Sequence, residues 1–205
     1  MRDIGTLGGT NSTAFGINDS GQVAGVSDTI AGFAGYDHAF LYSNGRMQDL
    51  GTLGGDYSTA SAINDRGQVV GLAVTADGSY HVFLYSNGAM QDLNTLSGVT
   101  GVPYGLNNNG QIVGYADNAN GQSYAFLYSE GVEVDLNSLM DPSLGVSLTD
   151  AHAINDLGQI AVDGIVDGRT NAFLLTPVPE PSTWALLGSS GLLLLGLLRS
   201  RTKHV

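Results

Sequence analysis

One short polar motif recurs along the chain, and its residue types could bind a metal ion. The copies begin at Asn18, Asn64, Asn107 and Asn155. Most read Asn-Asp-x-Gly, and closely spaced oxygen ligands at a turn suit a hard cation such as calcium. The weak candidate ligands are Asp19, Asp65 and Asp156. The third copy has Asn108 in place of the aspartate, and hairpin turns favour the same residues for backbone reasons. We therefore expect structural turns with no metal and no cofactor.

Two histidines occupy equivalent positions in the repeats and could act in metal binding or acid-base chemistry. These are His38 and His81. Tyr124 and Asn171 stand in the same register, so the position accepts any flat or polar side chain. We expect a structural role for it.

Patterns for covalent or phosphate chemistry are absent from the sequence. The glycine-rich stretches 5–9 and 51–55 are followed by neither Gly-Lys-Ser/Thr nor a helix, which excludes a phosphate loop. No Gly-x-Ser-x-Gly precedes a helix, which excludes a nucleophile elbow. We expect no catalytic residue and a protein that is not an enzyme. The alternative is an extracellular enzyme acting on glycans, which needs two carboxylates roughly 5 to 9 Å apart. The acidic residues considered for it are Asp37, Asp77, Asp117 and Asp167.

Residues 1–177 are organised as four tandem repeats, which must position these residues. Three signatures recur in fixed order: Asp-Ile/Leu-Gly/Asn-Thr/Ser-Leu from residue 3, Ile-Asn-Asp-x-Gly-Gln from residue 17 and His-Ala-Phe from residue 38. The second signature recurs at intervals of 46, 43 and 48 residues. A period of this length is typical of propeller blades.

Each repeat predicts two β-hairpins. In the first repeat we expect strands at 13–17, 22–26, 38–42 and 46–50, because each separator places Asn, Asp or Ser before a Gly that supplies positive φ. The Ala-Phe-Leu-Tyr strand is apolar on both faces, so its sheet must be covered on both sides. We expect an all-β, propeller-like array of four four-stranded antiparallel repeats. The core should include Phe40, Phe83, Phe126 and Phe173.

The two ends of the array could be complementary. The last repeat stops after residues 172–175, without the partner strand that the earlier repeats have. Residues 3–7 could supply that strand and close a ring of four repeats. If residues precede Met1, the repeats instead form part of a larger ring or an open array.

The repeats resemble the HAF family of probable extracellular repeats, named for the tripeptide found here at residues 38–40. The resemblance covers about residues 3–176, and Asp-Leu-Gly-Thr-Leu-Gly-Gly at 49–55 with Ile-Asn-Asp at 63–65 supports it. Only the phenylalanine persists in all four copies. The resemblance implies a location at the cell surface and no established activity.

Residues 178–205 form a separate segment made of a spacer, an apolar stretch and a basic cluster. The spacer contains Pro179, Glu180 and Pro181, which favour an extended chain. Residues 184–198 are apolar and predict a transmembrane helix of about 22 Å, short of a hydrocarbon core of about 30 Å. Arg199 and Arg201 follow, and clustered positive charge stays in the cytoplasm. The repeats are therefore expected on the far side of the membrane.

This tail resembles the PEP-CTERM sorting signal, which in Gram-negative bacteria marks exported proteins for an exosortase. The resemblance implies export across the inner membrane, transient membrane anchoring, cleavage near the Pro-Glu-Pro triplet by the exosortase-type membrane protease, and release or attachment at the cell surface. The expected partners are the exosortase, the inner membrane, and polysaccharide or envelope components. Exopolysaccharide often accompanies such proteins.

Composition agrees with an exported protein that does not bind nucleic acid. The chain has 19 acidic residues, 7 Lys or Arg and a net charge of −12, so it offers no basic patch to phosphates. It contains no cysteine, and its core alone must hold the fold. Residues 1–5 lack the features of a signal peptide, so we expect the true N-terminus upstream; the rival hypothesis is a cytosolic protein.

Overall fold

The computed structural model describes residues 1–29, 36–93, 101–177 and 195–196. These residues form an all-β structure of four antiparallel sheets, each with four strands in chain order. The first sheet contains β1 (Ser12–Ile17), β2 (Val23–Asp28), β3 (Asp37–Ser43) and β4 (Arg46–Asp49). The second contains β5 (Gly54–Ile63), β6 (Val69–Thr75), β7 (Tyr80–Ser86) and β8 (Ala89–Asp92). The predicted all-β class with four antiparallel sheets is confirmed.

The third and fourth sheets repeat the pattern with a different connection. The third contains β9 (Gly101–Leu106), β10 (Ile112–Asp117), β11 (Ser123–Ser129) and β12 (Val132–Asp135). Two short 3-10 helices, η1 (Leu136–Leu139) and η2 (Pro142–Leu144), lead to the fourth sheet. The fourth contains β13 (Ser147–Ile154), β14 (Ile160–Val166), β15 (Arg169–Pro177) and β16 (Leu195–Gly196).

The Asp-Leu-Gly-Thr-Leu signature is a linker between sheets rather than a strand. Asp49 ends β4, and its carboxylate accepts a hydrogen bond from the backbone N–H of Gly51 at 2.7 Å. Leu50 is buried, and its N–H donates to the carbonyl of Ala39 at 2.9 Å. The Asx turn at Asp49 stops the strand, and the leucine then inserts into the core between two sheets.

Each pair of neighbouring sheets shares one hydrophobic core. The first strand of a sheet packs on the sheet before it: β5 against β2 and β3, β9 against β5 and β6, and β13 against β10 and β11. Phe83 and Phe126 are at most 1% exposed in these cores, and Phe40 is fully buried in the first sheet. Phe173 is only partly buried because β16 pairs with β15 at Thr176 and Pro177 alone. The predicted core position of phenylalanine is therefore confirmed in three repeats and weaker in the fourth.

A bulge recurs where the first two strands of every sheet pair. In the first sheet Ala14 pairs with Gly25 and Gly16 with Ala24, which leaves Phe15 without a partner. The residues at this bulge position are Phe15, Ser61, Tyr104 and His152. A glycine lies opposite the bulge in the first three sheets, and Val162 takes that place in the fourth. A Cβ at Gly25 would sit 2.0 Å from the Thr13 carbonyl oxygen and 2.9 Å from the Phe40 ring. Only glycine allows this close approach.

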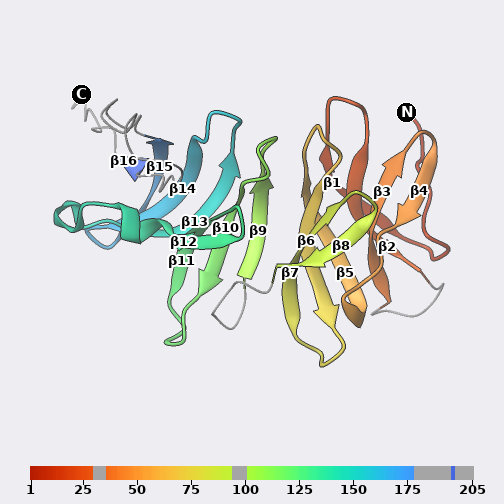
Figure 1. Ribbon diagram of the computed structural model, residues 1–205, viewed down its shortest axis with the longest axis horizontal. Coiled ribbons are helices and arrows are strands. Elements are labelled where there is room, and N and C mark those ends of the chain that lie inside the picture. Colours follow the sequence, from red (N-terminus) through yellow and green to blue (C-terminus); the bar gives the residue numbers. More distant parts are fainter. Residues whose placement is uncertain (30–35, 94–100, 178–194, 197–205) are drawn as a thin grey trace, which may run out of the picture.

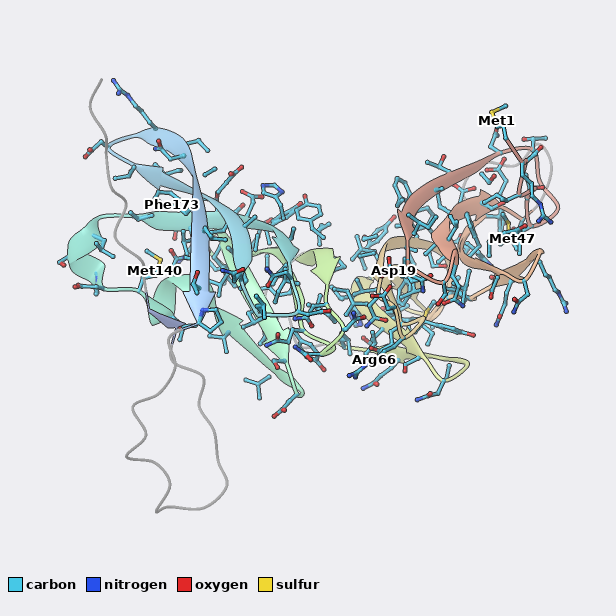
Figure 2. The ribbon with its side chains drawn as sticks, turned by 90° about the horizontal axis from the view of Figure 1, so that it is seen from above. Met1, Asp19, Met47, Arg66, Met140 and Phe173 are labelled. Carbon is cyan, nitrogen blue, oxygen red and sulfur yellow. The ribbon has the colours of Figure 1, made fainter. Side chains whose placement is uncertain are left out.

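The array is open, and the predicted pairing of residues 3–7 with 172–175 is wrong. Residues 3–7 belong to no strand, and Met1 and Phe173 lie at opposite ends of the molecule in Figure 2. In Figure 1 the N-terminal end likewise lies on the side of β4, far from β15. The rotation from one sheet to the next depends on the side chains packed between them. Three such steps leave the first and last sheets apart here.

The predicted helix over residues 184–198 lies outside the described residues, apart from the two residues of β16. Among the residues that are described, no helix has the length and apolar character needed to cross a membrane.

Candidate functional site

The four Asn-Asp-x-Gly motifs form the hairpin turns between the first two strands of each sheet, as predicted. In the first turn, the Asn18 N–H donates to the Gln22 carbonyl at 3.1 Å, and Gly21, with φ of 71°, donates back to the Asn18 carbonyl at 2.9 Å. The Asn18 side-chain oxygen accepts from the N–H groups of Ser20 and Gln22 at 3.1 and 3.0 Å. The asparagine thus holds its own turn closed.

These turns are also bonded to one another, which the sequence did not predict. The side-chain amide of Asn18 donates to the backbone carbonyl of Asn64 at 2.9 Å. Asn64 does the same to Asn107, and Asn107 to Asn155, both at 3.0 Å. Asn64 and Asn107 are almost fully buried, so each bond satisfies polar groups that water cannot reach. This asparagine ladder fixes the inner ends of the four sheets relative to one another.

A second row of bonds joins the residues that follow each asparagine. The Asp19 N–H donates to the Asp65 carboxylate at 2.9 Å, Asp65 N–H to the Asn108 side-chain oxygen at 2.8 Å, and Asn108 N–H to the Asp156 carboxylate at 2.7 Å. The Asn108 amide also donates to both neighbouring carboxylates, at 2.9 Å to Asp65 and 2.8 Å to Asp156. The asparagine of the third motif therefore has a role, because an aspartate at this position would place four like charges in a row.

The two rows border an open depression of about 320 Å³. Its wall combines apolar side chains from the strand ends with the polar turns. It is lined by Ile17, Asn18, Asp19, Ile63, Asn64, Asp65, Leu106, Asn107, Asn108, Ile154, Asn155 and Asp156. Figure 2 shows Asp19 toward the middle of the molecule, between the ends marked by Met1 and Phe173. The structure thus brings all three candidate metal ligands to one site.

Two of the three carboxylates at this depression, those of Asp65 and Asp156, already accept hydrogen bonds from N–H donors. Hydrogen bonds from the Asn108 amide and from the Asp19 N–H hold the pKa of Asp65 below its usual range. Within the described ranges, no group of three or more His, Asp or Glu side chains is placed to hold a metal ion. That the turns need no calcium stays a prediction.

The histidines of the His-Ala-Phe signature pair with the aspartates of the following signature. The Nδ1 atom of His38 lies 2.9 Å from both carboxylate oxygens of Asp49, and Nδ1 of His81 lies 2.9 Å from Asp92. In the third repeat, the Tyr124 hydroxyl donates to Glu133 at 2.9 Å. Burial raises the pKa of the Tyr124 hydroxyl, and the neighbouring Glu133 raises it further.

These pairs link β3 to β4 and β7 to β8, and they explain why two separate signatures recur together. The constant separation of 11 residues between histidine and aspartate was the available signal in the sequence. The fourth repeat has Asn171 at this position, and its amide donates instead to the Arg169 carbonyl at 3.0 Å.

The four acidic residues considered for catalysis lie in four different sheets, each at or beside the connection between the second and third strands. Asp37 begins β3, opposite Asp28 on β2. Asp77 accepts bonds from Thr75 and Ser79 in its turn. Asp117 ends β10, and Asp167 lies in the β14–β15 turn with φ of 52°. The structure therefore does not bring these four residues together. The sorting residues fall outside the described residues, namely Pro179, Glu180, Pro181, Arg199 and Arg201.

Comparison with known families assigns the tail. Residues 177–201 match the family of the PEP-CTERM protein-sorting motif. This motif implies an exported protein that is transiently anchored in the membrane and sorted by an exosortase, a membrane protein that processes such signals.

The repeats are less well matched. A search of curated proteins found no match. Among solved structures, the chain is similar to TolB from Acinetobacter baumannii, with a TM-score of 0.49 and 14% sequence identity. The match covers 79% of this chain and 42% of TolB, so the chain spans less than half the length of that structure. Similarity at this level carries no information about function.

Proposed function

We propose that the protein is a surface or extracellular-matrix repeat protein that acts as a non-enzymatic binding or structural module, associated with exopolysaccharide or the envelope of a Gram-negative bacterium. The observation that carries this proposal is the sorting motif at residues 177–201, which implies export and exosortase processing. The role assigned to the repeats is supported by their construction. Shared cores and the asparagine ladder hold the sheets in fixed positions, as a binding scaffold requires.

The same proposal describes the four sheets as blades of a propeller-like array of HAF repeats. Support comes from the four-stranded sheets, from the packing of each first strand on the preceding sheet, and from the first turns of the four sheets, which converge on one depression. The bonded His38–Asp49 and His81–Asp92 pairs give the signatures of the HAF resemblance a structural purpose.

Processing in an exosortase-bearing host tests the exported function. A signal peptide would be fused before Met1, and the matched variant would carry alanine at Pro179, Glu180 and Pro181. We expect the mature protein to lose the mass of residues beyond about Pro181 and to appear at the surface or in the medium. The alanine variant and an exosortase-deletion host should both retain the unprocessed chain in the membrane. Accumulation of Val205-ended protein with the exosortase active would refute the proposal.

A second candidate function, a glycan-degrading enzyme, is favoured by one carboxyl pair. Asp28 and Asp37 lie directly opposite each other on β2 and β3. Hydrogen bonds from Asn11 and Thr10 hold the pKa of Asp28 low, whereas burial and the Asp28 charge raise the pKa of Asp37. Two carboxyl groups with pKa values pushed apart are the pattern of an acid and its partner in glycoside hydrolysis.

This alternative has a direct test and a structural counterargument. Asp28 already accepts three bonds from Thr10 and Asn11, which anchors the chain before β1. Release of reducing ends from a panel of polysaccharides would be measured for the chain, for Asp37→Asn and for Asp77→Asn as the control. Activity lost only in Asp37→Asn would favour the enzyme over the binding module.

A further inference from the structure

The repeats differ in the residue at the bulge position, whereas the residues on either side of the bulge are similar from repeat to repeat. Small residues flank it on both sides in most copies, and Ile or Leu and Asn follow in every copy. The bulge residues themselves are Phe15, Ser61, Tyr104 and His152. A bulge re-aims the side chain that it carries and is frequent beside binding sites. Ser61 occupies the position in the second sheet, so the fold does not require a ring there.

Several of these side chains remain exposed on the first strands of their sheets. Phe15 is 55% exposed and Tyr104 is 39% exposed, and the His152 side chain is 52% exposed. A single exposed ring is ordinary on a protein surface, whereas exposed rings that adjoin one another mark a contact surface. Two of the residues, Tyr104 on β9 and His152 on β13, come from neighbouring sheets and meet.

The Tyr104–His152 patch consists of three rings and two carboxylates. Tyr104 stacks on His152 with centroids 5.6 Å apart and an interplanar angle of 19°. The Tyr115 ring lies 5.8 Å from Tyr104, tilted by 35°. The Nε2 atom of His152 lies 3.1 Å from the carboxylate of Asp163, and Asp150 is the cross-strand partner of Asp163. The patch therefore offers flat apolar rings beside strong hydrogen-bond acceptors.

The chemistry of the patch selects among ligand classes. Its carboxylates repel anions, and none of its residues is Lys or Arg. A purely apolar ligand would leave the carboxylates without hydrogen-bond donors. A pyranose ring satisfies both parts, because its C–H face packs on an aromatic ring while its hydroxyls donate to carboxylates. Burial raises the pKa of Tyr104, so its hydroxyl also stays available as a donor.

We infer that the Tyr104–His152 patch is a binding site for a neutral saccharide. The inference rests on the proposed function as a polysaccharide-associated module and assigns that role to one site. Tyr104 supplies the ring face, and His152 with Asp163 and Asp150 supplies the hydroxyl contacts.

Titration calorimetry with oligosaccharides of matched length and different charge tests the inference. The full chain would be held in a non-glycosidic detergent and titrated with N-acetylated chitohexaose, its cationic deacetylated form, and anionic hexagalacturonate. We expect binding of the neutral hexamer. Tyr104→Ala should weaken this binding at least about tenfold, the loss of one stacking contact, whereas Tyr104→Phe should retain most of it.

The matched control is Tyr80→Ala, which removes a tyrosine of the second sheet that is 53% exposed and lies edge-on to Tyr57. Its binding should equal that of the unmodified chain, and thermal unfolding would confirm that all variants are folded. Binding of the cationic hexamer alone would overturn the inference in favour of a cation site. Equal loss in both alanine variants, or no binding of any hexamer, would also overturn it. Exosortase processing is a separate readout, so these failures leave the export proposal standing.

Discussion

The side-chain amide of Asn64 donates a hydrogen bond to the backbone carbonyl of Asn107, 3.0 Å away, although 43 positions separate the two residues. The same amide donates to Gln68 within its own turn, and its oxygen accepts from Arg66 and Gln68. One buried side chain therefore closes a turn and joins two sheets.

Replacing Asn64 with alanine should lower the free energy of unfolding by about 2 to 3 kcal/mol, because buried donors and acceptors lose their partners. Denaturant unfolding measures the change. Asn155→Ala is the control: among the described residues its side chain bonds only within its own exposed turn, so its loss should cost less. Equal costs would show that the bond between turns contributes nothing.

Phe83→Ala should lower the free energy of unfolding by about 3 to 5 kcal/mol, because the ring is fully buried between two sheets. Phe173→Ala removes the same ring from a partly exposed site and should cost less. An unfolding midpoint that hardly moves in Phe83→Ala would contradict the core assignment.

Gly71→Ala should cost at least about 2 kcal/mol, because the new Cβ would lie 2.0 Å from the Thr59 carbonyl oxygen and 2.9 Å from the Phe83 ring. Gly78→Ala enters open space at φ of 87°, and its cost should be only the backbone strain of about 1 kcal/mol. The thermal unfolding midpoints of the two variants compare the cost of steric overlap at Gly71 with the cost of backbone strain at Gly78. Similar costs would mean that the bulge can relax.

Asp37→Asn should stabilise the fold at pH 7 and leave it unchanged near pH 3. The pKa of Asp37 is raised above its usual 3.8 by burial and by Asp28, so its neutral form is the one that the fold favours. Its contribution to stability is full below 3.8 and is lost as pH rises through the higher pKa of the folded state.

Asp77→Asn should show the opposite sign. Bonds from Thr75 and Ser79 lower the pKa of Asp77, so its contribution is present above 3.8 and is lost as pH falls through the lower folded pKa. Unfolding midpoints at several pH values distinguish the two variants. Parallel curves for both would contradict the assigned causes.

Calcium should not stabilise the turns. The carboxylates of Asp65 and Asp156 already accept bonds from Asn108, and a cation would have to displace them. Thermal unfolding with millimolar calcium and with chelator should give the same midpoint. A large upward shift with calcium, as linkage requires for a ligand of the folded state, would contradict the prediction.

Local patterns in the sequence determined the strands and turns. Asn-Asp-x-Gly and Ser-Asn-Gly place positive φ between short apolar runs, and the hairpins of the first sheet formed where predicted. The phenylalanine of each repeat was identified as core for the same reason, since its strand is apolar on both faces. Such features depend on neighbouring residues and the strand period, so a single sequence carries them.

Contacts between repeats were decided by the tertiary structure alone. Asn108 bridges Asp65 and Asp156, and Tyr104 meets His152, only because successive sheets pack with their turns and bulges in register. The open array has the same origin, because the rotation between sheets depends on side chains that meet only in the shared cores, where Ala60 and Ala151 are buried. No hydrophobic period records that angle, and its accumulation over four sheets separates Met1 from Phe173 (Figure 2).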